Sequence, residues 1–500
     1  MQINKEDIKG CTGEIAPWPI LSSHTVQLQT KDMRALNKLR DELRVEHCAL
    51  SSAWFRELGV RSGWRKGPCI YIEDHRSISR MSEEASKRFE YRMLGLASAK
   101  DGVLVSSPRD MDFEAYMGRA SATGPPHIWS VEQVTSSPRR RLASDALHHP
   151  DTFDALVQFT KQAGGINIVP YISSGDIWVL ASALARTTSL PVCVSAPPPA
   201  MSTLANDKVW FARTVSRLIG ARSVPITRAV YSMANLACTV RELAAISAQL
   251  VFKLPASAGG LGNISMDAAP FRGLRLAQIL TRLRGQLEKI GWRAGDKLLV
   301  GRWDAAVFAS PSVQIWVPET EQGKPIIEGI FMQKVKGRAG AFIGAERADL
   351  DADTVYTLTY QAMQIATLLQ ALGYMGRLSL DAVLLSSKVD RHEIHWIEAN
   401  ARWGGVSIPM TIANKLGYGK PQSHIAITQH HIDLGDQNSM ARIEVEFEAR
   451  KRNQEFGPFE TALFLVPPRT GLALILGIAE RTETAHELVK IALSACSQAD

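Results

Sequence analysis

Cysteine is scarce in this sequence, and the spacing of the few that occur argues against two classes of protein. The 500 residues include six cysteines, at positions 11, 48, 69, 193, 238 and 496. None forms a C-x-x-C pair, so we expect neither a zinc site nor a disulfide framework. Widely separated thiols of this kind are typical of a reduced, cytoplasmic protein, which is the location we predict.

Long hydrophobic runs and basic stripes are also missing. No stretch reaches the roughly 18 consecutive apolar residues of a membrane-spanning helix, and the polar start MQINKEDIKG is unlike a signal peptide. Lysine and arginine exceed aspartate and glutamate, 57 against 50, but they are scattered rather than interleaved with aromatic residues. We therefore expect neither a nucleic-acid nor a membrane partner, and the basic balance favours small anions instead.

What the first half does contain is an alternation of strand and helix patterns. Apolar strands are predicted at 69–74 and 101–108, and helices at 82–98 and 112–120. The stretch 166–184 again reads as strand, loop and helix. Such alternation predicts an open α/β sheet of the Rossmann-like kind. Upstream, residues 26–47 have apolar positions at helical spacing and predict an amphipathic helix.

Two later stretches, GRLSLDAVLL (376–385) and IEANARWGG (397–405), carry the clearest chemistry. Residues two apart on a strand share a face, so Glu398 and Asn400 project together. If 386–392 closes a hairpin, Asp381 falls directly opposite Glu398. Facing carboxylates are destabilising unless a cation lies between them, and Mg²⁺ binds one or two carboxylates together with phosphates. The alternative is a polar face on a solvent-exposed hairpin.

Two lysines are candidates for binding phosphate. Lys208 follows Asn206–Asp207, a good helix N-cap, where the helix dipole disfavours a cation unless an anion is nearby. Lys253 ends an apolar strand and precedes a loop of small residues whose backbone can approach an anion closely. The loop positions are Ser257, Gly259, Gly260 and Gly262. Solvated surface lysines are the alternative interpretation.

In order and spacing, these motifs resemble those of the ATP-grasp carboxylate–amine ligases. The resemblance runs over roughly 85–500, through Lys208, Lys253 with its glycine loop, Asp381, and the run Glu398-x-Asn400-x-Arg402. Residues 81–145 are in addition similar to the pre-ATP-grasp domain of peptide ligases of the pheganomycin peptide ligase type. The resemblance implies ATP and one or two Mg²⁺, with Mn²⁺ as an alternative, held by Asp381, Glu398 and Asn400.

The resemblance also implies that Arg402 orients the γ-phosphate or the reacting carboxylate. By strand alternation, Arg377 shares the strand face of Asp381 and would reach the acid substrate. Lys336 and Arg338, in a basic glycine-punctuated loop, would close over an acyl phosphate, and a solvated basic loop is the alternative. The adenine would pair with the backbone of the strand LLVGRW, through Leu299, Val300, Arg302 and Trp303. Here the sequence departs from the family, because Gly301 and Arg302 replace acidic residues that recognise adenine and ribose, which leaves the base preference open.

The fold class that follows is α/β (α+β), with a Rossmann-like pre-ATP-grasp domain before a two-subdomain ATP-grasp module. The expected function is an ATP-dependent ligase that joins a small carboxylate and an amine, an amino acid or peptide in natural-product biosynthesis, with a homodimer left open. An ATP-grasp phosphotransferase and a non-catalytic nucleotide-binding protein are the alternatives. The expected segments are an N-terminal extension (1–80), the pre-ATP-grasp domain (81–195), two ATP-grasp subdomains (196–300 and 301–425) and C-terminal closing elements (426–500).

Three histidines in a stretch read as a polar loop complete the candidate residues. His424, His430 and His431 would either form a metal cluster or be solvated. Downstream of them, TALFLVPP and GLALILGIA predict two buried strands, and TETAHELVKIALSAC predicts a terminal amphipathic helix.

Overall fold

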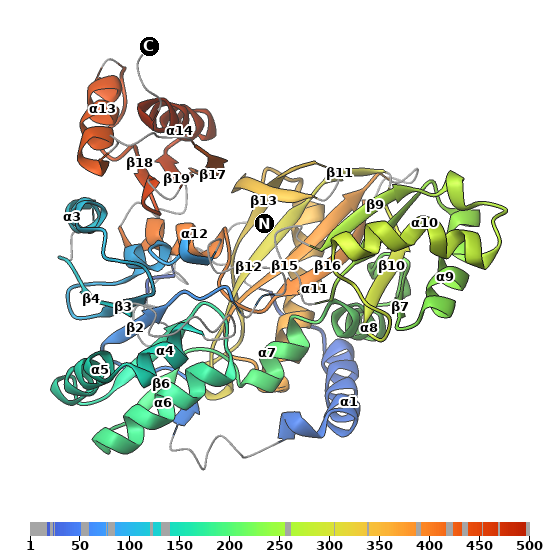
Figure 1. Ribbon diagram of the computed structural model, residues 1–500, viewed down its shortest axis with the longest axis horizontal. Coiled ribbons are helices and arrows are strands. Elements are labelled where there is room, and N and C mark those ends of the chain that lie inside the picture. Colours follow the sequence, from blue (N-terminus) through green and yellow to red (C-terminus); the bar gives the residue numbers. More distant parts are fainter. Residues whose placement is uncertain are drawn as a thin grey trace.

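A computed structural model describes most of the chain (Figure 1). The described residues are 18–20, 24, 26–51, 60–76, 78, 86–120, 124–131, 141–255, 262–304, 306–337, 340–386, 392–416, 424–432, 439–452, 454–468 and 471–496. They form three sheets, of six, four and nine strands. No helix among them is long and apolar enough to span a bilayer.

The first sheet is six-stranded and parallel, and helices cover both of its faces. Its strands, in spatial order, are β1 (Val60–Ser62), β6 (Val192–Val194), β5 (Ile166–Pro170), β2 (Cys69–Ile72), β3 (Gly102–Val105) and β4 (His127–Ser130). Strands buried on both faces read as continuous apolar runs, which is why 69–74, 101–108 and 166–170 could be predicted. Those predictions are confirmed, but the sheet begins at Val60, upstream of the expected boundary at residue 80.

Four α-helices pack on this sheet. Ile70, Ile72 and Leu104 face one helical layer, while Tyr71 and Val103 face the opposite side. The helices are α3 (Met111–Ala120), α4 (Leu142–His148), α5 (Pro150–Gln162) and α6 (Gly175–Thr188).

The helix predicted over 82–98 is wrong from residue 88 onward. Residues 88–91 are turns, and Arg92–Leu96 form the 3₁₀ helix η2. Glu90 and Arg92 are both buried, and both hold groups at the carboxyl edge of the sheet. Residues two apart on an α-helix do not face the same way, so a regular helix cannot direct both side chains there.

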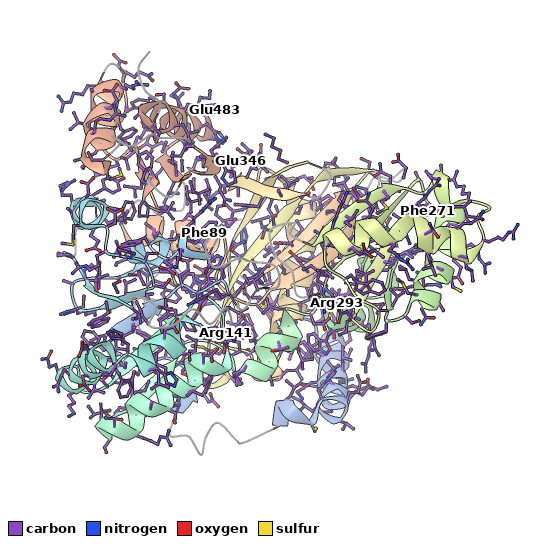
Figure 2. All side chains as sticks on the ribbon, in the orientation of Figure 1. Phe89, Arg141, Phe271, Arg293, Glu346 and Glu483 are labelled. Carbon is purple, nitrogen blue, oxygen red and sulfur yellow. The ribbon has the colours of Figure 1, made fainter. Side chains whose placement is uncertain are left out.

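The second sheet is four-stranded and antiparallel, and it forms the lobe at the right of Figure 1. Its order is β7 (Thr227–Val230), β10 (Leu298–Arg302), β8 (Gln249–Lys253) and β9 (Asn263–Asp267). Helices α9 (Met233–Ile246) and α10 (Leu276–Lys289) bury their apolar stripes against one face of it. Phe271, labelled in Figure 2, lies in this core.

The third sheet contains the candidate site and has nine antiparallel strands in the described part of the chain. Between the two other sheets, β12 is central, with β15 and β16 on one side and β13 and β14 on the other. The strands are β11 (Val307–Ala309), β12 (Pro311–Val317), β13 (Ile326–Lys336), β14 (Ala341–Arg347), β15 (Gly376–Leu385), β16 (Glu393–Asn400), β17 (His424–His431), β18 (Thr461–Phe464) and β19 (Leu472–Ala479).

Helices on both sides of the sheet pack against it in the described part of the chain. The long helix α11 packs on the apolar face made by Val313, Ile315 and Leu380. The N-terminal helix α1 is confirmed within the predicted 26–47. The helices are α1 (Thr30–Glu46), α8 (Lys208–Leu218), α11 (Ala352–Ala371), α12 (Ser407–Lys415), α13 (Met440–Arg452) and α14 (Thr482–Cys496).

The polarity of β12 alternates as in a solvent-exposed strand, yet all of its residues are buried, because β13 and β15 flank it and its polar side chains face the candidate site. His424, His430 and His431, expected in or near a polar loop, lie on strand β17. The downstream strands β18 and β19 and the terminal helix are confirmed, and β17 to β19 continue the sheet of the candidate site.

Candidate active site

The two acidic strands form the predicted pair. In the antiparallel register of β15 and β16, Asp381 lies opposite Glu398 and Ser379 lies opposite Asn400. The register then shifts, so that Ala382 pairs with Trp396 and Ile397 is the extra residue of a bulge. A bulge bends its strand and re-aims side chains, here beside the paired carboxylates. The prediction that Asp381 faces Glu398 is confirmed.

Asp381 is held by two donors while it faces a like charge. Ser312 Oγ donates to Asp381 Oδ1 at 2.6 Å, and Asn400 Nδ2 donates to Oδ2 at 2.8 Å. Gln314 Nε2 in turn donates to Ser312 Oγ at 2.9 Å. Burial, and then repulsion from Glu398, raise the pKa of Asp381 above its usual range. A cation would remove that repulsion, and the oxygen donors present suit Mg²⁺.

Lys208 is buried against the second carboxylate instead of being solvated. Asp207 caps α8 by accepting from the backbone N–H groups of Val209 and Trp210, which confirms the predicted helix start. Lys208, at the first position, is 6% exposed, and its Nζ lies 2.8 Å from Glu398 Oε2. Although burial opposes it, the charge of Lys208 lowers the pKa of Glu398. The two carboxylates are therefore pushed toward opposite protonation behaviour.

Lys253 brings a second cation to the site. It ends β8 and pairs in register with Leu299 on one side and Asn263 on the other. Burial lowers the pKa of Lys253, and Glu398 and Asp304 are carboxylates near enough to oppose that shift. Within the described residues, Lys253 makes no ion pair. A half-buried cation without a direct partner is suited to an anionic ligand.

Only part of the predicted glycine loop falls in the described residues. Gly262 has φ +78°, a conformation that favours glycine, and its carbonyl accepts from the Leu254 N–H at 3.1 Å. Ser257, Gly259 and Gly260 lie outside the described residues, as does Arg338. Lys336 is exposed at the end of β13.

The predicted adenine contacts on β10 stay a prediction, and the sheet occupies part of the backbone concerned. Leu299 and Val300 pair with β7 on one side and β8 on the other. The N–H groups of Arg302 and Trp303 donate to Ile226 and Gln249 carbonyls. Since a central strand has its backbone groups occupied by its neighbours, Leu299 and Val300 offer less backbone to adenine than Trp303, which lies beyond the end of β10.

Two residues at this end of the site were missed in the sequence. Asp304, just beyond β10, is buried, and its Oδ2 lies 2.8 Å from His395 Nδ1 on β16. Asp304 Oδ1 has no hydrogen-bond partner within the described residues. Asp304 was overlooked because an acidic residue was expected at Gly301 or Arg302, and Asp304 lies two positions after Arg302.

Arg402 extends the site beyond β16 and is fixed through its neighbours. Its guanidinium Nη1 donates to Asn206 Oδ1 at 2.7 Å, and the Ala401 N–H donates to the same oxygen. The Trp403 N–H donates to the Tyr171 carbonyl at 3.0 Å, across to the six-stranded sheet. Arg402 Nε is buried and has no hydrogen-bond partner in the described part of the chain.

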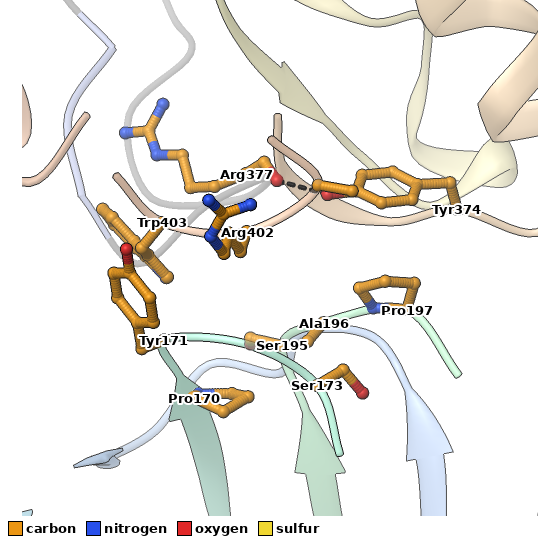
Figure 3. Close-up of a pocket in the computed structure, with 11 residues that line it drawn as sticks. Pro170, Tyr171, Ser173, Ser195, Ala196, Pro197, Tyr374, Arg377, Arg402 and Trp403 are labelled. Carbon is orange, nitrogen blue, oxygen red and sulfur yellow. Dashed lines mark hydrogen bonds between the residues drawn. The ribbon is translucent and has the colours of Figure 1, made fainter. Parts of the chain in front are cut away.

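Arg377 does share the strand face of Asp381, but its guanidinium is already engaged. It forms an ion pair with Glu328, both side chains being 1% exposed, and it donates to Thr411 Oγ1 at 2.6 Å. These two buried partners occupy both Nη groups of Arg377, whereas its Nε has no hydrogen-bond partner among the described residues. Arg377 also lines the pocket described below, so its contact with the substrate stays a prediction. In Figure 3 the Arg377 guanidinium points away from Ser173 and Ser195.

A small pocket lies between Arg402 and the ends of the parallel strands (Figure 3). The pocket is partly open to solvent, and its free space is about that of a single water molecule. The six-stranded sheet contributes Tyr171, Ser173 and Ser195, and the site contributes Tyr374, Arg377, Arg402 and Trp403. The pocket combines two arginines, hydroxyl groups and aromatic walls, and none of the residues that line it is acidic, so its chemistry suits a small anionic group.

His424, His430 and His431 do not form a metal cluster among the described residues. His424 Nδ1 lies 2.8 Å from Thr482 Oγ1, and His430 and His431 are exposed on β17. Among the described residues, no cluster of three or more histidine, cysteine or acidic side chains could hold a metal ion.

Comparisons with known proteins bear on this architecture. The family model of the Pre ATP-grasp domain matches residues 90–186. Biotin carboxylase from Campylobacter jejuni, solved as a β-γ-ATP complex, is similar with a TM-score of 0.52 and 15% identity, over 86% of this chain and 91% of that one. The fold is an ATP-grasp fold behind a pre-ATP-grasp domain.

A second solved structure agrees with this fold. It is the biotin carboxylase domain of the Hydrogenobacter thermophilus 2-oxoglutarate carboxylase with Mg-ADP, ADP and bicarbonate, at a TM-score of 0.52 and 12% identity, over 86% of this chain and 90% of that one. The L-amino acid ligase of Bacillus licheniformis has a TM-score of 0.48 and 14% identity, over 86% and 98%. No curated protein sequence matches the chain.

Proposed function

We propose that the protein is an ATP-dependent carboxylate–amine ligase that forms an amide through an acyl phosphate. The observation that carries this proposal is the facing pair Asp381 and Glu398, with Lys208 buried against Glu398 and Arg402 just beyond the end of β16. A structural ion pair would balance these charges internally. Here a repelling pair of acids and a half-buried Lys253 are brought together, as expected where a metal and phosphates bind.

Each residue has a role in this proposal. Asp381, Glu398 and Asn400 hold one or two Mg²⁺, and Lys208 and Lys253 neutralise phosphate oxygens. Arg402 orients the γ-phosphate or the reacting carboxylate by a bidentate fork that lysine cannot reproduce. The bound Mg-ATP supplies the phosphoryl group, and positioning with charge stabilisation is most of what phosphoryl transfer requires.

The proposed substrates are a nucleotide, a small carboxylate and an amine, and each rests on a different observation. Two structures of the same fold hold β-γ-ATP and Mg-ADP with bicarbonate, which supports a nucleotide and a carboxylate-like anion here. The pocket beside Arg402 is small and lacks acids, which supports a small carboxylate. The amino acid or peptide amine, and a role in natural-product biosynthesis of the pheganomycin type, are proposed from the sequence resemblance alone. A cytoplasmic location and a homodimer stay predictions.

The test is product analysis with an isotope. Pooled acids and amines are screened for ADP release, and the active pair is repeated with an ¹⁸O-labelled carboxylate. We expect one labelled oxygen in inorganic phosphate for each amide formed. A phosphorylated product without amide, or ADP with no label in phosphate, would establish the phosphotransferase alternative instead.

A matched pair of variants ties the reaction to the site. Glu398→Gln should lose at least about 100-fold in kcat, since it weakens both the metal site and the contact to Lys208. Glu393→Gln changes the same residue type on the same strand, but at an exposed position, and should keep full activity. Equal activity of the two variants would contradict the site assignment.

A further inference from the structure

The N-terminal segment contacts two parts of the candidate site. We define the N-terminal strap as the described residues 18–20, 24 and 26–46. Trp18 is 3% exposed and belongs to the core beside Arg402, while the His24 N–H donates to the Ile327 carbonyl on β13 at 2.9 Å. Farther along, α1 packs against α8 and α11. The strap therefore reaches from the Arg402 side of the site to the helix that carries Lys208.

Trp18 completes a cage of three tryptophans around Arg377. The Arg377 guanidinium carbon lies 4.9 Å from the ring centre of Trp18, 5.7 Å from that of Trp316 and 5.0 Å from that of Trp403. Trp18 meets the other two rings edge-on, at 5.0 and 4.8 Å between ring centres. Cation–π contacts of this kind are stronger when they are desolvated, as here.

The caged group is an ion pair that holds two strands and a helix together. Arg377 on β15 pairs with Glu328 on β13 and donates to Thr411 on α12. Burial lowers the pKa of Arg377, yet a guanidinium stays protonated in proteins, so the cage encloses two charges. A buried charge pair of this sort is rigid only while its surroundings exclude water.

Through Trp403, the cage bears on Arg402. Trp403 is the next residue in the chain, and its N–H is fixed to the Tyr171 carbonyl, while its ring packs against Trp18. Asn206 holds the other side of Arg402. Arg402 therefore lies between two fixed residues, Asn206 and Trp403. Trp18 of the strap packs against the ring of Trp403.

The other end of the strap bears on Lys208. Arg217 of α8 forms ion pairs with Glu42 and Glu46 of α1, each at 2.8 Å. Leu36, Leu39 and Leu43 of α1 bury in the same core as Trp210 and Phe211 of α8. The position of α8 sets where its first residue, Lys208, meets Glu398.

We propose that the N-terminal strap is a positioning element of the active site and that Trp18 is a positioning residue for Arg402. This inference rests on the proposed function, because Arg402 is expected to act on the γ-phosphate. Trp18 acts by ring packing alone, because its Nε1 has no hydrogen-bond partner among the described residues. A phenylalanine should therefore replace it in part, whereas leucine keeps bulk but lacks an aromatic face.

The experiment compares two nucleotides by calorimetry in the full-length protein. Mg-adenylyl imidodiphosphate carries a γ-phosphate, and Mg-ADP does not. In Trp18→Leu and Trp18→Ala we expect affinity for the imidodiphosphate to fall roughly tenfold or more, since small displacements of positioning groups are costly, with Mg-ADP affinity within about twofold. Arg402→Ala should show the same selective loss, and Trp18→Phe should recover most of the affinity.

Trp129 provides the matched control. It packs against His127 and Phe159 at the far edge of the six-stranded sheet, so Trp129→Ala should leave both affinities unchanged. Near-ultraviolet circular dichroism reports whether each variant is folded, and Trp18→Leu decides the matter if Trp18→Ala is not. Suppose Trp18→Leu binds both nucleotides as tightly as the wild type, while Arg402→Ala binds Mg-adenylyl imidodiphosphate more weakly but Mg-ADP normally. That result would overturn the positioning role of the strap and leave the proposed function in place. A wild-type protein that binds neither nucleotide would overturn the proposed function and the strap together.

Discussion

Buried or half-buried carboxylates lie against both the six-stranded sheet and the nine-stranded sheet, but their surroundings differ. Glu73, after β2, is fully buried, and its Oε1 contacts both Arg92 and His75 Nε2. Glu90 accepts from the N–H groups of Ser106 and Ser107, after β3, at 2.8 and 3.1 Å. Asp381 and Glu398 instead face one another across a strand pair.

The difference explains which sheet is equipped for a phosphate ligand. In open parallel sheets, ligands commonly bind at the carboxyl ends of the strands, and successive backbone N–H groups there attract anions. At the end of β3 those groups are occupied by the Glu90 carboxylate. In the nine-stranded sheet, Asp381 and Glu398 carry like charges, and Lys253, which faces them from the four-stranded sheet, makes no ion pair among the described residues. A metal-bound phosphate would correct this local imbalance of charge.

The comparison predicts opposite effects of removing one buried negative charge. Glu73→Gln leaves the Arg92 guanidinium buried without its anion, which should cost about 3–5 kcal/mol of unfolding free energy. Asp381→Asn removes a repulsion and should cost less than about 1 kcal/mol or stabilise the ligand-free protein. Urea unfolding of both variants, without nucleotide at neutral pH, measures the difference. Equal destabilisation would mean that the Asp381–Glu398 pair is structural.

A structural feature could be predicted from the sequence when it depends on residues close together in the chain, and could not when it depends on distant ones. The facing of Asp381 and Glu398 follows from strand alternation and the length of one hairpin, so it could be predicted. The parallel strands could be found because they are buried on both faces. The surroundings of Arg377 could not, because Trp18, Glu328 and Thr411 come from distant parts of the chain.

Other predictions considered one strand without its neighbours. The alternation of β12 looks solvent-exposed only if the polar face is assumed to meet water, whereas Ser312 and Gln314 face Asp381. The backbone of Leu299 and Val300 seemed open to adenine because the pairing of β10 on both sides is not encoded locally. In both cases the missing information was the position of the strand within its sheet.

Lys208 and Lys253 allow the same comparison of stability against nucleotide affinity to be made with positive charges. Lys253→Met removes a half-buried cation that has no ion pair among the described residues, so stability should be kept or raised while affinity for Mg-ATP falls roughly 10- to 100-fold. Lys208→Met leaves Glu398 without its 2.8 Å partner and should lose stability as well. Calorimetry and urea unfolding give the two readouts, with exposed Lys289→Met, in the same lobe as Lys253, as the control. Lys253→Met binding nucleotide as tightly as Lys289→Met would place the phosphates elsewhere.

The smallest expected effect is on the pH dependence of nucleotide binding. The pKa of Asp381 is raised above its usual value by burial and by Glu398, whereas that of Glu398 is lowered by Lys208. As pH falls through the raised pKa, Asp381 takes up a proton that the metal must displace, so Mg-nucleotide affinity should weaken. The loss approaches about tenfold per pH unit for one proton.

Glu90, at the six-stranded sheet, also has a raised pKa and can be compared with Asp381. Burial also raises the pKa of Glu90, but within the described residues Glu90 bonds to the Ser106 and Ser107 groups, so its titration should not couple to nucleotide binding. Mg-ADP affinity is measured from pH 5 to 8 in the wild type and in Asp381→Asn. Because the nucleotide phosphate titrates in the same range, the difference between the two slopes is the readout. Asp381→Asn should bind more weakly and have a flatter profile, since the competing proton has no carboxylate to occupy, whereas parallel profiles would show that Asp381 does not contact the metal.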